Sequence, residues 1–424
     1  MDGIDRTGIE DSLRSLDSRE MPDDRAKPAA TINESFTSRH CDAPTINHNV
    51  YILGAGFSVD GGIPVVKNFL ERMADSVDWL ESQKRSREAE AIRKVFEFRL
   101  RAAGAAYRTH IDVDNIEELF SLASASEVEG AVDHLTLAIA ATIDVARSTI
   151  ATPECVVGER IVVDEVGGWT KRDIKHLTYQ LYAGILSSSL SENAPNETNT
   201  IITLNYDTLL EDALSELSIP YHYGLPNSHT QYDDSAKCFL NDDTKAVPIY
   251  KLHGSVNWSK PPLWGMKMKV HGSYTEQRKW GVGPLLIPPT WRKEFAGQLA
   301  HVWERAVSAL ETATRIIVIG FSMPAADNHF KYLIGAGLQR NISLRKFLFV
   351  NPGLRDKDEG KRLRRNLFSI LREELEKKGL VLLVDMRTDE FLLSRANLAL
   401  INRAYLKDYL EITYEGRDGI QIYH

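Results

Sequence analysis

The sequence predicts an α/β protein built on a doubly wound parallel sheet with an inserted helical subdomain. Apolar runs of strand length alternate along the chain with stretches of helical periodicity, and several of these runs end in glycine or in a polar residue. The clearest run, 50–53, is followed by the sequence Gly-Ala-Gly-Phe-Ser. Two glycines and a small residue allow a chain to leave a buried parallel strand and turn tightly, so we expect a Rossmann-like sheet.

The other predicted elements follow the same reasoning. Further apolar runs predict strands at 200–204, 247–252, 315–319, 346–350 and 380–384. Apolar residues at helical spacing predict helices at 65–80, 85–106, 116–125, 131–149, 170–190, 208–217, 295–313, 325–338 and 361–378. Segment 256–292 is rich in Trp, Gly and Pro, and its part 286–291 is expected to form a rigid pocket wall.

The domain organisation comes from the spacing of these elements. A crossover between parallel strands needs about a dozen residues, so the helices between the first two strands predict an inserted subdomain over about 68–198. This insert lies within a main domain over 47–388. Residues 1–46 are polar with little periodicity, which predicts a poorly packed arm or an oligomerisation tail. A helix and a small hairpin are expected over 389–424.

Composition excludes few classes of protein. The formal net charge of −8 disfavours strong, nonspecific attraction to nucleic acid, and the basic run 361–365 is expected to be a solvated helix face. No apolar stretch approaches the roughly 20 residues of a membrane span, and the polar start is unlike a secretory signal, so a cytoplasmic location is expected. Cys41, Cys155 and Cys238 are isolated, which predicts neither a disulfide framework nor a zinc site.

Polar side chains stand just beyond three of the predicted strands. Ser58 follows the first, Asn205 and Asp207 follow the second, and His253 follows the third. Open α/β sheets bind ligands at the carboxyl ends of their strands. Singly, Asn205 is more typical of a turn, His253 of a structural histidine and Asp207 of a helix cap. Their joint placement favours a site.

The ordered motifs Gly-Ala-Gly-x-Ser, Gly-Ile-Pro, Asn-Tyr-Asp and His-Gly-Ser together resemble the sirtuin-like NAD-binding family. The resemblance extends over about 50–385 and includes Ile-Gly-Phe-Ser at 319–322 and Val-Asn at 350–351. It implies that NAD is bound, with no zinc. The residues that the resemblance assigns to NAD are Gly54, Ala55, Gly56, Ser58, Pro64, Asp207, Gly320, Ser322 and Asn351.

The resemblance also assigns the chemistry to Asn205 and His253. Cleavage of the N-glycosidic bond of NAD passes through a ribosyl oxocarbenium ion, and an uncharged amide can hold the attacking water or a ribose hydroxyl. A neutral imidazole can accept a proton near pH 7, so His253 is expected to be a general base. His329 is a second candidate, equally typical of a buried structural histidine, and Asn115 is expected to cap the helix at 116–125.

Two departures from deacylating sirtuins favour a branch of the family that consumes NAD. No cysteine pairs follow His253, although a zinc ribbon stands there in the deacylases, and Val65-Val66-Lys67 replaces Asp-Phe-Arg after Gly-Ile-Pro. The resemblance therefore implies an NAD glycohydrolase of bacterial anti-phage defence. It implies a homo-oligomer, and a HerA-type hexameric ATPase or a short Argonaute as partner.

Two alternatives stay open at this stage. A protein deacylase or ADP-ribosyltransferase would need a peptide cleft. A noncatalytic module that senses NAD or ADP-ribose would tolerate the loss of both Asn205 and His253. The sequence equally leaves open whether NAD or NADP is preferred and whether ADP-ribose is cyclised.

Overall fold

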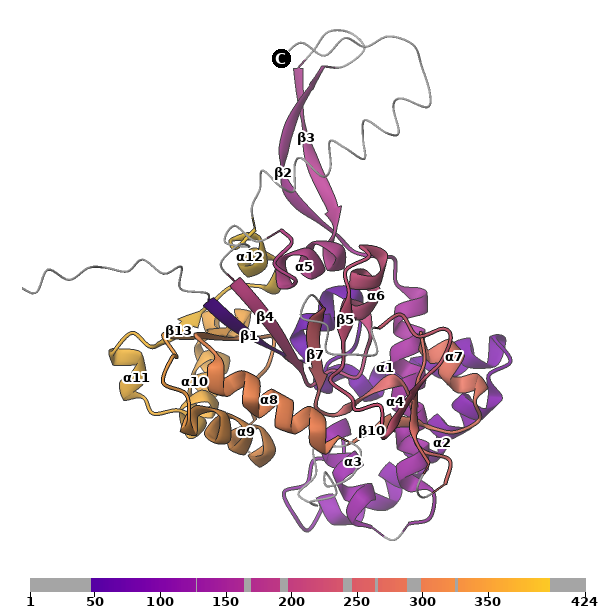
Figure 1. Cartoon of the computed structure of the whole chain (residues 1–424). Helices are drawn as coiled ribbons and strands as arrows, with labels where there is room; N and C mark the ends of the chain where they lie inside the picture. The colour runs from indigo at the N-terminus through magenta and orange to yellow at the C-terminus, as the bar shows by residue number, and fades with distance from the viewer. Residues whose placement is uncertain are drawn as a thin grey trace, which may run out of the picture. The chain divides into compact units, whose positions relative to one another are not determined.

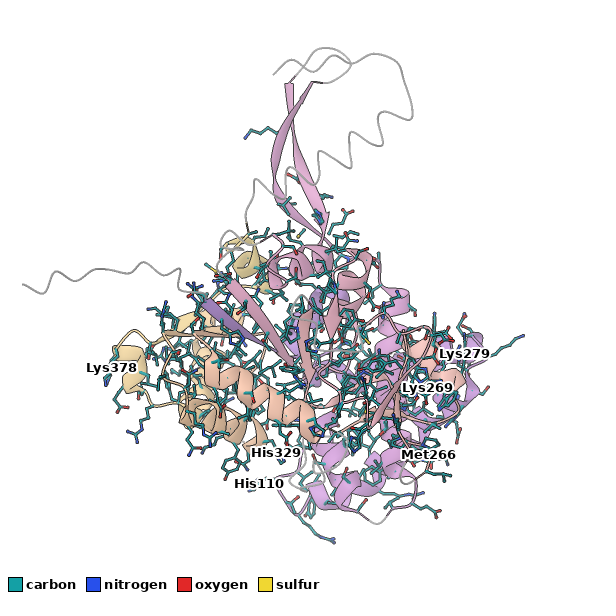
Figure 2. The ribbon with its side chains drawn as sticks, in the orientation of Figure 1. His110, Met266, Lys269, Lys279, His329 and Lys378 are labelled. Carbon is teal, nitrogen blue, oxygen red and sulfur yellow. The ribbon has the colours of Figure 1, made fainter. Side chains whose placement is uncertain are left out.

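The computed structural model of the protein describes residues 47–126, 128–163, 169–190, 197–238, 246–263, 266–287, 299–324 and 327–396. Its centre is a seven-stranded sheet in which all neighbouring strands run parallel (Figure 1). In order across the sheet the strands are β13 Val381–Val384, β12 Lys346–Val350, β11 Arg315–Ile319, β1 Asn47–Leu53, β4 Glu197–Thr203, β7 Val247–Lys251 and β5 Tyr221–His222. The predicted parallel sheet is confirmed, and all six predicted strands belong to it.

The direction of winding reverses at β1. The chain builds β4, β5 and β7 on one side of β1 and later builds β11, β12 and β13 on the other side. Because parallel crossovers are right-handed, the two directions of winding place their helices on opposite faces of the sheet. Ligands of such sheets bind beyond the carboxyl ends of the strands at the reversal. The segments that follow β1, β4 and β11 are therefore the expected place for a site.

Four helices follow the first turn, as predicted, and enclose a second hydrophobic core. They are α1 Phe69–Ser82, α2 Ser86–Ala106, α3 Ile116–Ala125 and α4 Ala131–Thr149. Met73, Ile92, Leu119 and Leu135 are buried in this core, which Tyr274 joins from outside the four helices. The side chain of Asn115 accepts hydrogen bonds from the first turn of α3, which confirms the predicted cap.

The predicted helix at 170–190 is wrong in its first half. An antiparallel hairpin, β2 Glu154–Val163 with β3 Trp169–Leu177, precedes the shorter helix α5 Thr178–Leu186 (Figure 1). Ile174 and Leu177 are spaced three residues apart, which is typical of a helix, but pairing with the valine-rich β2 satisfies the backbone of this segment instead.

A second sheet is formed by four strands that the sequence analysis did not predict. It has the order β10 Pro284–Leu286, β8 Gly254–Ser259, β9 Met268–Val270 and β6 Thr230–Tyr232. Three of these strands have only three residues each, which is too short for an alternating pattern to be recognised. The predicted pocket wall at 286–291 lies mostly outside the described residues.

Most of the remaining helices agree with the predicted order but differ in length, and one of them, Tyr274–Lys279, was not predicted. They are α6 Leu209–Glu216, α7 Tyr274–Lys279, α8 Ala300–Thr312, α9 Asn328–Gln339, α10 Lys357–Ile370, α11 Glu374–Lys377 and α12 Thr388–Leu393. The single helix expected at 361–378 is divided into α10 and α11, because the chain is extended at Leu371, where α10 ends. The amino-terminal arm and the carboxy-terminal hairpin lie outside the described residues. Among the helices that are described, none has the length and apolarity needed to cross a membrane.

Two glycine turns touch each other across the reversal point of the sheet. Gly54 N donates to Ile319 O at 3.0 Å, and Gly56 N donates to Gly320 O at 2.7 Å. A Cβ atom on Gly56 would lie 2.8 Å from the Cα of Gly320, and Gly320 has a φ of +64°. Glycine is needed at 56 and 320 because two backbones approach here at a distance that excludes side chains.

We predict that Gly320→Ala lowers the free energy of unfolding by about 2–4 kcal/mol, because it combines a left-handed backbone with a Cβ that meets the first turn. Gly104→Ala is the matched control. Gly104 lies in α2 with open space around its Cα, so alanine should raise the free energy of unfolding by up to about 1 kcal/mol. Urea denaturation of both variants measures this difference, and equal effects would contradict the proposed packing constraint.

Candidate functional site

A cavity of about 470 Å³ lies beyond the carboxyl ends of the central strands. Residues that follow four neighbouring strands line it: Ser58 after β1, Asn205 after β4, Gly320 after β11 and Asn351 after β12. Its volume is in the range of pockets that enclose small ligands and cofactors. The fold thus brings together side chains that are far apart in the sequence, at the position expected for a doubly wound sheet.

Most of the other residues predicted for the site also reach the cavity. Ala55, Gly56, Pro64, Asp207 and Ser322 line it. Gly54 contributes through its backbone carbonyl, described below. His253 is not one of the described residues that line the cavity.

A chain of hydrogen bonds joins the ends of β1 and β4. Asn205 Nδ2 donates to Ser58 Oγ at 2.9 Å, and Ser58 Oγ donates to Asp207 Oδ2 at 2.7 Å. Asp207 Oδ1 also accepts from the backbone N–H of Leu209 at 3.1 Å, as its predicted role at the start of α6 requires. Ser58 is buried and gives its proton to Asp207, so in this arrangement it orients Asn205. The resemblance assigns Ser58 to NAD, and in this structure its proton is used on Asp207.

These contacts fix the orientation of the Asn205 amide. Nδ2 also donates to Gly54 O at 2.9 Å, and a carbonyl oxygen can only accept. Both N–H bonds of Asn205 are therefore used on its two partners in the first turn. The carbonyl Oδ1 remains to accept a hydrogen bond from a group in the cavity, such as a hydroxyl or a water.

The first turn offers fewer N–H donors to a ligand than its sequence suggests. After β1 the chain enters a short 3₁₀ helix, Ala55–Gly61, and Gly56 N is bound to Gly320 O. Gly56 thus serves the packing of the two turns and does not present its own N–H to an anion. Ala55 is exposed and lines the cavity, which leaves the adjoining backbone accessible.

A buried ion pair helps to hold the turn after β4 in place. Lys251, the last residue of β7, donates to the backbone carbonyl of Asp207 and to Glu211 Oε1, the latter at 2.7 Å. Both side chains are almost fully buried, and Tyr223 Oη lies 3.5 Å from the same carboxylate oxygen. Burial raises the pKa of Glu211, and Lys251 opposes that rise. One lysine therefore ties β7 to the turn that carries Asn205, Tyr206 and Asp207.

His253 lies behind Tyr206. The two ring centroids are 6.3 Å apart, and Tyr206, which lines the cavity, donates its hydroxyl to Ile287 O at 3.0 Å. Burial lowers the pKa of His253, while the nearby Asp327 raises it, so the imidazole is neutral near pH 7. This protonation state suits a base, and the ring contacts Tyr206, a residue that lines the cavity, without being one of the described lining residues itself.

Helices outside the sheet contribute cavity residues that the sequence analysis did not assign. Glu117 and Phe120 come from α3, Ile139 and Ile143 from α4, and Arg362 from α10. Arg362 belongs to the basic run that was expected to be a solvated helix face, and its side chain is exposed as expected but also lines the cavity. Charged residues on helices are usually solvated, so only the tertiary arrangement could reveal these positions.

Comparison with known proteins supports part of the predicted relationship. The family model described as a SIR2-like domain matches residues 199–380, a stretch that includes Asn205 and His253 but not the first glycine turn. No curated protein sequence matches the chain.

Solved structures of Sir2 enzymes are similar at low identity. A structure described for the mechanism and regulation of Sir2 enzymes is 12% identical, with 84% of this chain and 94% of the other covered and a TM-score of 0.38. A complex of Sir2 with a p53 peptide and NAD⁺ is 14% identical, with 81% and 90% covered and a TM-score of 0.32. Scores this low carry no inference about the chemistry of this chain.

We predict that Lys251→Met lowers the free energy of unfolding by about 3–5 kcal/mol, because it leaves the Glu211 carboxylate buried without its partner. The double variant Lys251→Met/Glu211→Leu should recover most of this loss. Lys94→Met, which removes an exposed lysine paired with Glu97, should cost at most about 0.5 kcal/mol. Urea denaturation tests the set, and similar losses for the two lysine variants would refute a supporting role for the buried pair.

Proposed function

We propose that the cavity binds NAD and that the protein cleaves the bond between nicotinamide and ribose, releasing nicotinamide and ADP-ribose. The observation that carries this proposal is the orientation of Asn205, whose Oδ1 is left to accept a hydrogen bond in a cavity at the reversal point of the sheet. The match of residues 199–380 to the SIR2-like domain, with two of the motifs preceding it and the others inside it, supports the binding of NAD.

The charges of the cavity wall suit a dinucleotide. Lys67 and Arg362 line it, and Arg362 lies on α10, the first α-helix after Asn351, which the resemblance assigns to NAD. Cations at this position would stabilise the pyrophosphate. The apolar side chains of α3 and α4, among them Phe120 and Ile143, line another part of the wall and would exclude water from a planar ring.

In the proposed reaction the oxygen of a water molecule bonds to C1′ of the ribose while the bond from C1′ to the nicotinamide nitrogen breaks. The bonding pair leaves with the ring, so nicotinamide departs neutral, and one proton of the water passes to a base. Asn205 Oδ1 accepts a hydrogen bond from the attacking water and holds it against C1′. The Ser58 and Gly54 contacts keep this amide from rotating as the positive charge moves to the ribose.

The identity of the base is a separate part of the proposal. His253 is neutral near pH 7 and adjoins Tyr206, so a shift of Tyr206 on substrate binding would bring the imidazole to the cavity.

The biological setting rests on resemblance alone: an NADase of anti-phage defence, acting as a homo-oligomer in the cytoplasm with a HerA-type ATPase or a short Argonaute as its partner. A protein deacylase remains the main alternative.

We predict that Asn205→Ala reduces NAD hydrolysis by at least about a hundredfold, because the water loses its acceptor. Two hydrogen bonds to the first turn are also lost, so the free energy of unfolding should fall by about 1–2 kcal/mol. Chromatography of nicotinamide and ADP-ribose measures the first effect, and binding of ADP-ribose shows that the cavity persists. Full turnover by the variant would move the chemistry away from Asn205.

We predict that His253→Ala lowers kcat by about a hundredfold, with binding of ADP-ribose unchanged, as expected for loss of a general base. The exposed His229 provides a control, and His229→Ala should leave kcat unchanged. The pH profile of kcat distinguishes the roles: the acidic limb should disappear in His253→Ala. A variant that keeps both its rate and its acidic limb would show that His253 is structural.

A further inference from the structure

The charged residues that line the cavity differ in sign and in pairing between α10 and α3. Arg362 and Glu359 come from α10, where Arg362 Nε donates to Glu359 Oε2 at 2.8 Å. This hydrogen bond is the main cause that lowers the pKa of Glu359, and Lys67 adds to it. From α3 comes a single carboxylate, Glu117, together with apolar side chains. A cationic and ion-paired group therefore lines the cavity from one helix, and an acidic residue lines it from another.

Glu117 is held by a rigid piece of backbone. It is the second residue of α3, and its N–H donates to the side chain of Asn115 at 2.9 Å. Leu119 and Phe120, just after it, are buried in the helical core against α4. Among the described residues, no side chain forms an ion pair or a hydrogen bond with the Glu117 carboxylate. The group is therefore positioned by its helix and remains available to a ligand.

The surroundings of Glu117 favour its neutral form when no cation is present. Burial is the main cause that raises its pKa to about 7, and Asp327 at the start of α9 and Glu118 on α3 raise it further. The side chain nevertheless has a large accessible surface, as expected for a group that faces a cavity enclosed by protein. Of the other titratable groups nearby, Tyr206 faces it after β4, and Asp327 is linked electrostatically to His253.

We propose that Glu117 recognises the positive charge of the nicotinamide ring, so that the cavity selects the oxidised dinucleotide over the reduced one. This inference rests on the proposed function. NAD⁺ and NADH have nearly the same shape but differ in the charge of this ring. An unpaired carboxylate beside an apolar wall is the group that would distinguish them, because it attracts the cationic ring and gains nothing from the neutral one.

The sign of the pH dependence follows from this arrangement. At pH 6 Glu117 is mostly protonated and attracts the cation weakly, whereas at pH 8 it is ionised and attracts it fully. A bound cation lowers the pKa of Glu117, so the affinity for the cationic ring must rise with pH. A lowering of about 1 to 2 pH units corresponds to an affinity gain of about five- to tenfold between pH 6 and pH 8.

The experiment is calorimetric titration of the full chain at pH 6 and pH 8 with three probes. Carba-NAD carries the cationic ring without a cleavable ribosyl bond, NADH carries the neutral ring, and ADP-ribose lacks the ring. We expect carba-NAD to bind about five- to tenfold more tightly at pH 8 than at pH 6, relative to NADH and ADP-ribose. Titration of groups remote from the ring affects all three probes and cancels in these ratios, whereas titration of a group near the ring, such as His253, is distinguished by Glu117→Gln.

Glu117→Gln should remove the pH dependence specific to carba-NAD and leave ADP-ribose binding unchanged. Glu118→Gln is the matched control: it alters the neighbouring carboxylate, which accepts from Asp112 N at 2.7 Å, and should retain the pH dependence. In hydrolysis, Glu117→Gln should raise KM more than it lowers kcat, since the ring loses its charge as it departs.

The outcomes separate this inference from the function on which it rests. If ADP-ribose binds, two results overturn the role of Glu117 and leave the NAD site intact. One is a ratio of carba-NAD to NADH affinity that does not depend on pH. The other is a pH dependence of this ratio that persists in Glu117→Gln. Failure of ADP-ribose and carba-NAD to bind at either pH overturns the proposed function and this inference together.

Discussion

The contact between the glycine turns after β1 and β11 is the constraint on which the site depends. Side chains cannot stand between Gly56 and Gly320, so the two backbones meet directly. This contact fixes the height of the first turn above the sheet and therefore the position of the Gly54 carbonyl. Gly54 in turn orients the Asn205 amide. The two glycines therefore shape the site in two ways. They fix the packing and hydrogen bonds of the turns, and they leave space beside the backbone.

A buried ion pair is the second constraint on the position of the site residues. Lys251 and Glu211 are both buried, and neither charge would be tolerable there alone. The lysine also binds the backbone carbonyl of Asp207, so the strand that precedes His253 holds the turn that carries Asn205. A buried pair of this kind contributes little net stability compared with apolar residues. The ion pair instead fixes the relative positions of two adjacent strand ends, which carry polar side chains of the site.

Much of the sheet could be predicted from local sequence because each buried parallel strand is a short apolar run that ends in a turn. The same rule brought Ser58, Asn205 and Asp207 together, since the carboxyl ends of adjacent strands meet at one edge. The hairpin β2–β3 was missed because spacing alone does not distinguish a strand from a helix over 170–177. Arg362 was not assigned to the cavity because its approach depends on how α10 packs, and no local pattern encodes that packing. The segment around Glu117 resembles a pattern of the NAD-consuming branch, but its place in the cavity depends on how α3 packs.

The cavity wall also bears on the distinction between cleaving NAD and transferring an acyl group. Val65, Val66 and Lys67 line the cavity where deacylating sirtuins carry Asp-Phe-Arg, so the cation of that triplet is kept and the acid and the aromatic ring are replaced. An acid from a different element, Glu117 of α3, lines the same cavity. With the acid on a helix of the insert rather than on the loop after the first turn, the uncharged amide of Asn205 presents its Oδ1 to the cavity beyond β4. That arrangement suits attack by water, because water needs only an acceptor and a fixed direction of approach.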